Sequence, residues 1–222
     1  FNRINEVDPP KQLAEILRPY QVAGYHWLNY LTEVGWGGIL ADDMGAMVAG
    51  SLEPQVVQAC EAFVRNSSSA QEATVLAPGV ASVDRYAAAC ANGMAITWCE
   101  LDEGFRNAAC HGGAYTLPAL LAEAQACNAS VEQVLRAVAV AYEVTTRFAL
   151  AYPFPSFYVH PHAAFATIGA AVAVSLVRGH GAQRLQDCVT GAASMAFAGP
   201  FDTAVEGSLV RNAWTSARSE EH

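Results

Sequence analysis

The sequence predicts an all-α fold for the chain from about residue 50 onward. Three observations support this prediction. Apolar residues, mostly Ala and Val, recur at helical spacing in this part of the chain. Ser130 precedes Gln133 by three residues, the spacing of a capping box that begins a helix. We find no convincing segment in which apolar and polar residues alternate as they do in a half-buried strand.

The expected helices have clear boundaries. Pro54 begins the first, a polar loop separates it from the second, and the Ser130 capping box begins the fourth. Prolines between residues 153 and 161 force the chain out of helix, and two glycines near residue 180 separate the last two helices. The helices are expected over residues 54–65, 83–95, 117–127, 131–150, 163–177 and 182–196.

Residues 1–47 differ in style from residues 48–222, and we assign them to a separate segment. The segment is polar and aromatic, with apolar residues at helical spacing over 13–31. It ends in GGILADDMG (37–45), which indicates the approach to a nucleotide-binding loop. Such a loop needs a lysine and a hydroxyl residue for the phosphates and magnesium, but Met47, Val48 and Ala49 stand there. We therefore expect no ATP hydrolysis.

Composition excludes several classes of protein. Hydrophobic residues make up 53% and charged residues 15%, which is typical of a globular protein with a large core. The net charge of −9 argues against nucleic-acid binding, which needs clustered Lys and Arg. The longest uncharged apolar run, Ala163 to Val177, is shorter than the roughly 20 residues that span a membrane. No membrane or nucleic-acid partner is expected.

Six scattered cysteines without a C-x-x-C pair, in a chain that opens with no secretory signal, indicate reduced thiols in a cytoplasmic protein. A metal site formed by Cys99, Cys110 and His111 is possible but disfavoured, because zinc motifs usually pair their ligands more closely. We expect no metal.

The loop CELDEGFRNAACHGG (99–113) is the first candidate for chemistry. It places the carboxylates of Glu100, Asp102 and Glu103, together with Arg106 and His111, between two apolar helices. Neighbouring carboxylates raise one another's pKa and a histidine titrates near neutrality, so this group could move protons. The alternative is a solvated acidic loop.

Two further stretches could contribute to a site. His160 and His162 flank Pro161 before an apolar helix, whose positive end favours neutral imidazole, a possible base. Arg211, in EGSLVRNAW, is of the type that holds a carboxylate with two hydrogen bonds. Taken alone, the two histidines could equally belong to a turn that faces solvent. An arginine such as Arg211 is, taken alone, more often a surface or salt-bridging residue.

Residues 13–45 resemble the opening of the Swi/Snf family of helicase-like ATPases. The resemblance rests on LRPYQ (17–21), Gly24, WL (27–28) and GGILADDMG, and it stops before the phosphate-binding lysine.

From about residue 50 to 218 the chain resembles the MmgE/PrpD family, which includes 2-methylcitrate dehydratase, cis-aconitate decarboxylase and an iminodisuccinate epimerase. Four blocks carry this resemblance in order: the segment from AACANGMAITWCELDEGF through HGGAYTLPALLAEA, then LRAVAVAYEVTTRFA, HPHAAFATIGAAVAVSLVRG and EGSLVRNAW. They fit the first half of such a protein. The chain thus looks like a fusion of two incomplete pieces, with a truncated MmgE/PrpD-like helical domain after the helicase-like segment.

The second resemblance implies a helical domain without metal or organic cofactor, acting by acid–base chemistry on a small di- or tricarboxylic acid, and a homodimer. The histidine of the family's His-Pro-Gly motif falls on His111, with Gly112 in place of the proline. Its histidine before the long Ala-rich helix falls on His160, and its acidic pair falls on Glu100 and Asp102–Glu103.

Substrate carboxylates are expected at Arg106 or Arg211; Arg211 stands where the family often has a lysine. We expect His111 and His160 to face one cleft, with Asp102 orienting one imidazole. Two alternatives to a dehydratase, decarboxylase or epimerase remain at this point. One is a fragment of a DNA-dependent ATPase, and the other is a catalytically silent helical oligomerisation module.

Overall fold

The computed structural model describes residues 7–10, 22, 26, 29, 38–66, 70–79, 82–154 and 160–195. The chain divides into two units, Phe1–Asp42 and Asp43–His222. In the first unit, the backbone N–H of Val7 donates to Nδ1 of His26 at 3.0 Å. The second unit contains the helical domain and is considered by itself below.

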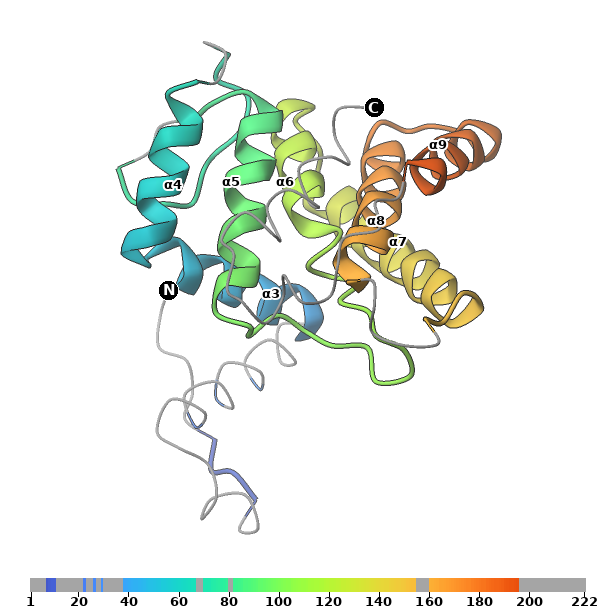
Figure 1. The fold of residues 1–222 in the computed structure, drawn as a ribbon, viewed down its shortest axis with the longest axis horizontal. Helices are drawn as coiled ribbons and strands as arrows, with labels where there is room; N and C mark the ends of the chain where they lie inside the picture. Colours follow the sequence, from blue (N-terminus) through green and yellow to red (C-terminus); the bar gives the residue numbers. More distant parts are fainter. Residues whose placement is uncertain are drawn as a thin grey trace. The chain divides into compact units, whose positions relative to one another are not determined.

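Seven helices and no strand form the described part of the chain, so the predicted all-α fold is confirmed (Figure 1). They are α3 (Gly38–Ser51), α4 (Pro54–Val64), α5 (Arg85–Trp98), α6 (Leu117–Ala126), α7 (Val131–Ala151), α8 (Pro161–Val177) and α9 (Ala182–Ser194). The last six agree closely with the helices expected from the sequence. None of these described helices combines the length and hydrophobicity needed to cross a membrane.

Helix α3 corrects one expectation from the sequence. The stretch GGILADDMG does not approach a phosphate loop; from Gly38 it is the first part of a 14-residue helix. Ala41, Ala46 and Met47 on this helix are buried, so its apolar side chains contribute to the core instead of cradling a nucleotide. The expected segment boundary after residue 47 falls inside α3.

Local capping explains where three helices begin. The Asp84 carboxylate accepts a hydrogen bond from the backbone N–H of Ala87 and begins α5. Ser130 and Gln133 form the expected capping box of α7, each side chain bonding the other's backbone N–H. His160 caps α8, and Pro161 occupies the first helical turn, where its missing N–H costs no hydrogen bond.

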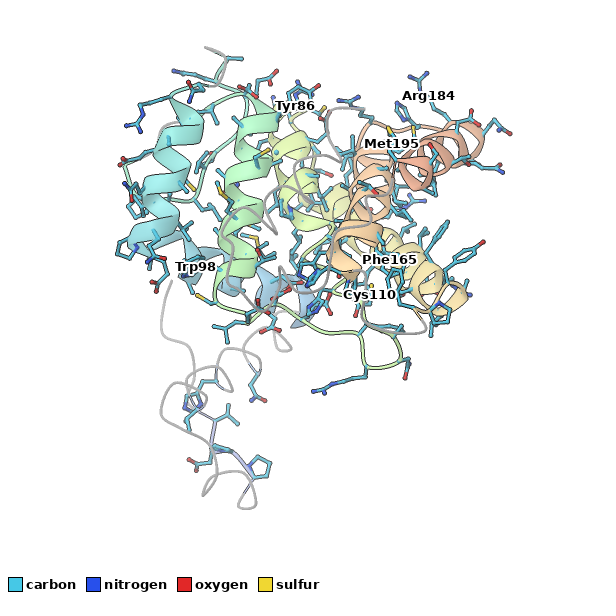
Figure 2. The ribbon with its side chains drawn as sticks, viewed as in Figure 1. Tyr86, Trp98, Cys110, Phe165, Arg184 and Met195 are labelled. Atoms are coloured by element: carbon cyan, nitrogen blue, oxygen red, sulfur yellow. The ribbon has the colours of Figure 1, made fainter. Side chains whose placement is uncertain are left out.

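Helix α8 is central to the packing, since it contacts α6, α7 and α9, while α4, α5 and α6 lie side by side (Figure 1). Small residues allow close approach: a Cβ at Gly50 of α3 would lie 2.0 Å from the carbonyl oxygen of Ala95 in α5. Figure 2 shows the side chains. Phe165 and Cys110 belong to the core, whereas Tyr86 and Arg184 are exposed.

A buried carboxylate joins three of these helices. Glu123 of α6, with only 3% of its side chain exposed, pairs with Arg85 of α5 at 2.9 Å and with Arg178 at the end of α8 at 2.8 Å. Arg85 also pairs with Glu72 at 2.8 Å. Burial opposes the charged form of Glu123, but its hydrogen bonds from Arg178, Cys127 and Arg85 outweigh burial and lower its pKa to about 2.

We predict that Glu123→Ala destabilises the domain by about 3–5 kcal/mol, because it leaves two arginines without their shared buried partner. Urea unfolding followed by circular dichroism measures this change. The matched control is Glu143→Ala, since the Glu143–Arg147 pair is exposed on both sides and should contribute at most about 0.5 kcal/mol. Equal losses for the two variants would contradict the structural role of Glu123.

Because of the Glu123 carboxylate, we expect the stability of the domain to fall at acidic pH. The pKa of Glu123 is lower in the folded chain than its ordinary value of 4.5, so its contribution is complete above pH 4.5 and is lost as pH falls toward about 2. Glu123→Gln should therefore show a shallower loss of stability over this range than the unmodified chain.

Candidate active site

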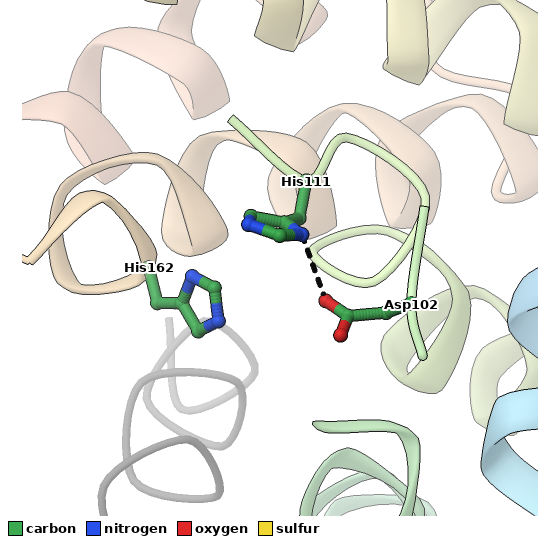
Figure 3. Close-up of side chains that lie close together, drawn as sticks. All are labelled: Asp102, His111 and His162. Carbon is green, nitrogen blue, oxygen red and sulfur yellow. Dashed lines mark ion pairs between the residues drawn. The ribbon is translucent and has the colours of Figure 1, made fainter. Parts of the chain in front are cut away.

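The loop between α5 and α6 and the start of α8 together carry the candidate site. The loop supplies Asp102, Glu103 and His111, and α8 supplies His160 as its cap and His162 in its first turn. These segments are about 50 residues apart in the sequence, yet the His111 and His162 ring centroids lie 4.9 Å apart (Figure 3).

Hydrogen bonds of Glu103 fix the conformation of the loop between α5 and α6. Glu103 is buried, and its backbone N–H donates to Oδ1 of Asp43 on α3 at 2.9 Å. Its Oε1 accepts from the backbone N–H of Gly113 at 2.6 Å, and its Oε2 accepts from the Tyr142 hydroxyl of α7 at 3.3 Å. Burial raises the pKa of Glu103, and the Gly113 hydrogen bond offsets part of that effect. The loop is therefore bonded to α3 and α7 on both sides of Asp102 and His111.

Gly112 must be small for this arrangement to form. A Cβ at residue 112 would lie 2.8 Å from Cδ2 of the Tyr142 ring, closer than real Cβ contacts allow. The proline that the resemblance leads one to expect at this position would carry such a Cβ. Gly112 thus lets the Tyr142 ring lie against the loop while its hydroxyl reaches Glu103.

Asp102 and His111 form the acidic–imidazole pair. Oδ2 of Asp102 lies 3.0 Å from Nδ1 of His111; 3% of the Asp102 side chain is exposed against 32% of the His111 side chain. Burial disfavours charged imidazole, but the Asp102 carboxylate, with Glu103 nearby, outweighs burial and raises the pKa of His111 above its ordinary value. The pair therefore has a shielded carboxylate and an imidazole that a small molecule can reach.

His162 lies between the other two histidines. Its ring centroid is 4.3 Å from that of His160 and 4.9 Å from that of His111. Its Nδ1 forms a 2.8 Å hydrogen bond with the hydroxyl of Tyr115, a buried residue in the turn two residues before α6. Burial raises the pKa of Tyr115 well above its usual value, so the hydroxyl keeps its proton. The backbone N–H of His162 donates to Nδ1 of His160, which completes the cap.

The structure brings some of the predicted residues together and not others. Asp102, His111 and His160 lie in one cluster, connected through His162. Glu100 is exposed in the first turn of the loop with a φ of 51°, and Arg106 is exposed farther along the same loop. Arg211 lies outside the described residues.

Two residues of the cluster had no assigned role in the sequence analysis. His162 was noted only as a neighbour of His160, and Tyr115 was not considered. A weak signal existed for each: His162 lies two residues after His160 at a helix start, and Tyr115 lies four residues after His111 in a turn that leads into a helix. Their meeting is a tertiary contact that neither spacing predicts.

The residues that could hold a metal ion also differ from those considered from sequence. Potential ligand atoms of Asp102, His111 and His162 all lie within 4.8 Å of one another, and this is the group found among the described residues. The cysteines suit a metal less well. Cys110 is buried, and burial raises its pKa to about 12, which disfavours the thiolate that binds zinc.

Two curated proteins match a short part of the chain. They are the chromatin-remodeling ATPases INO80 of Kluyveromyces lactis, 51% identical over 39 residues, and of Pyricularia oryzae, 50% identical over 40 residues. Each match covers 18% of this chain but only 3% and 2% of the respective relative. These similarities are too short to indicate a shared function.

The family comparison covers far more of the molecule. The sequence model of the MmgE/PrpD N-terminal domain matches residues 37–217. The matched range includes most of the chain, all the helices from α4 to α9, and both segments that form the histidine cluster. The chain therefore belongs to the MmgE/PrpD family.

Proposed function

We propose that this chain carries out acid–base chemistry of the MmgE/PrpD type on a small di- or tricarboxylic acid, as a dehydratase, decarboxylase or epimerase. The observation that carries the proposal is the Asp102–His111 pair, with its partly exposed imidazole 4.9 Å from the ring of His162. Removal of a proton beside a carboxylate needs a positioned base and a means to stabilise the charge that the base acquires.

In this proposal His111 takes the proton. The shielded carboxylate of Asp102 holds the imidazole and stabilises its charged form, as carboxylates do for catalytic histidines in other enzymes. His160 supplies or receives the second proton. Because His160 also caps α8 through the N–H of His162, its ring is fixed by the helix start rather than by a loop.

The substrate carboxylates need fixed positive charge. We propose Arg106 and Arg211 for this role, because a guanidinium stays charged and matches a carboxylate with two hydrogen bonds. Arg106 is exposed in the loop that holds His111, so its long side chain is free to meet a ligand entering from solvent. Glu100, in the same loop, is proposed to assist proton transfer. No metal or organic cofactor is needed for this chemistry.

The alternatives are a helicase-like ATPase fragment and a silent helical module. The helical course of residues 38–51 and the lack of a lysine after GGILADDMG speak against the first. We propose that residues 1–47 are a helicase-like piece joined to an MmgE/PrpD-like piece over residues 48–222. The family match begins at residue 37 and so overlaps the GGILADDMG stretch of the helicase-like motif. Turnover distinguishes the enzyme from the silent module.

We predict that the chain catalyses exchange of carbon-bound protons of citrate, isocitrate, cis-aconitate or malate with deuterium, or converts one of them, because His111 removes a proton beside a carboxylate. Proton NMR in deuterated buffer measures both events. His111→Asn and His160→Asn should each slow the reaction by about 100-fold or more, since a positioned base contributes at least that factor.

His180→Asn is the matched control. His180 bonds to Ser175 near the end of α8, away from the cluster, and its loss should leave the rate unchanged while circular dichroism confirms folding of every variant. If the unmodified chain neither exchanges nor converts any of the four acids, the silent module is the better account. If the chain is active and neither His111→Asn nor His160→Asn slows the reaction, these two histidines do not have the proposed roles.

We further propose that the chain forms a two-fold homodimer in the cytoplasm. Several large apolar side chains of the domain are exposed: 66% for Val131 and Tyr152, 61% for Leu52 and 57% for Leu101. Covering such surface is a common basis of self-association. The six cysteines, all among the described residues, form no disulfide, which suits a reducing compartment.

Light scattering at micromolar concentration should give a mass of twice that of one chain, because two copies can cover each other's exposed apolar side chains. A mass of one chain across a tenfold range of concentration would count against the dimer.

A further inference from the structure

Tyr115 connects the two segments that form the histidine cluster. Its backbone N–H donates to the carbonyl oxygen of His111 at 3.1 Å, and its hydroxyl bonds Nδ1 of His162 at 2.8 Å. The centroid of the Tyr115 ring lies 5.0 Å from that of His162 and 6.1 Å from that of His111. The proton transfers assigned to His111 and His160 do not use Tyr115, so its place between the loop and α8 calls for a different role.

The direction of the bond between Tyr115 and His162 follows from burial. Tyr115 is only 2% exposed, and Nδ1 of His162 is the acceptor that the described part of the chain offers to its hydroxyl. If Nδ1 carried a proton and donated to Tyr115, the buried O–H would have no acceptor, at a cost of about 1–3 kcal/mol. The Tyr115 hydroxyl therefore donates and Nδ1 of His162 accepts.

This hydrogen bond selects one form of the His162 ring. A neutral imidazole has one nitrogen that donates and one that accepts, so a ring that accepts at Nδ1 carries its proton on Nε2. The bond also fixes which way the ring faces, because a half-turn about the Cβ–Cγ bond would place a carbon atom opposite the Tyr115 hydroxyl. Both the tautomer and the orientation of His162 thus depend on Tyr115.

The orientation of His162 in turn affects the two rings beside it. The His162 ring lies at 87° to the ring of His160, with centroids 4.3 Å apart, and at 78° to the ring of His111, with centroids 4.9 Å apart (Figure 3). Aromatic rings in contact prefer such edge-to-face arrangements, so each contact favours a defined orientation of the neighbouring ring.

We propose that Tyr115 and His162 are positioning residues for the proposed reaction. Tyr115 fixes the tautomer and the orientation of His162, and His162 orients the rings of His111 and His160. The catalytic consequence of this inference rests on the proposed function, whereas the tautomer and the ring orientations do not.

NMR of the full chain with ¹⁵N-labelled histidine tests the pair without turnover, because the nitrogen shifts distinguish protonated from unprotonated ring nitrogens. We expect Nδ1 of His162 to be unprotonated and Nε2 to be protonated, with His162→Asn identifying these signals by their loss. Tyr115→Phe should give a mixture of the two tautomers and weaken the nuclear Overhauser effects from His162 to His111 and His160. A protonated Nδ1 of His162 in the unmodified chain would overturn the proposal.

Kinetics provide a second readout. Tyr115→Phe should lower kcat by about 10- to 100-fold, since small displacements of catalytic groups have effects of this size. KM should stay within about twofold, because the buried hydroxyl does not contact the substrate. His162→Asn keeps an acceptor for the Tyr115 hydroxyl but has no ring, so we expect a similar loss of kcat.

Tyr86→Phe is the matched control. It removes the same hydroxyl from an exposed tyrosine in the first turn of α5, at the end of that helix opposite the loop that carries His111 (Figure 2). It should leave the histidine spectrum and kcat unchanged, and circular dichroism establishes that each variant is folded. A folded Tyr115→Phe variant with unchanged tautomer and Overhauser effects overturns the positioning pair and leaves the acid–base function standing. Absence of turnover in the unmodified chain counts against the proposed function, and the spectra then still decide whether the pair exists.

Discussion

The buried carboxylate of Glu103 sets the position of the candidate site. Its side chain accepts hydrogen bonds from Gly113 and Tyr142, and its backbone N–H donates to Asp43. These bonds connect the loop between α5 and α6 to α3 and α7, on both sides of the Asp102–His111 pair. A buried carboxylate that loses such a partner costs about 1–3 kcal/mol or more, so the bonds favour one loop conformation over others. The imidazole of His111 then has a defined place in spite of being on a loop.

The start of α8 provides the other side of the site, and it is fixed by helix capping and packing rather than by loop hydrogen bonds. Pro161 and the His160 cap fix where the helix begins, and α8 is packed against α6, α7 and α9. The backbone N–H of His162 donates to Nδ1 of His160, and the His162 ring bonds the Tyr115 hydroxyl. The site is thus a meeting of one hydrogen-bonded loop with one packed helix end. This arrangement suits the proposed proton transfer, which requires side chains whose orientation is fixed in advance.

The sequence predicted the helices well because their signals are local. The Ser130 capping box and the prolines before α8 act over a few residues, and the structure contains both at the expected places. Helix α3 was missed for a physical reason: its apolar residues suit a buried helix, but its glycines and acidic pair also match the approach to a phosphate loop. Only the burial of residues such as Met47 distinguishes these two structures.

Only part of the candidate site could be predicted in the same way. The segments around His111 and His160 were expected to converge through a family resemblance, not through spacing, because they are far apart in the sequence. The place of His162 and Tyr115 depends on how α6 and α8 pack, which no local pattern encodes. Glu103 was recognised as one carboxylate of an acidic loop, yet its burial makes it a structural anchor.

The convergence of the loop and α8 is the central claim, and nuclear Overhauser effects between histidine rings test it most directly. With isotope-labelled histidine in the full chain, ring protons of His111 and His162 should show a cross-peak, since the ring centroids are 4.9 Å apart. We predict that this cross-peak disappears in Glu103→Ala while the helical circular dichroism remains. Absence of the cross-peak in the unmodified, folded chain would show that the loop and α8 do not converge.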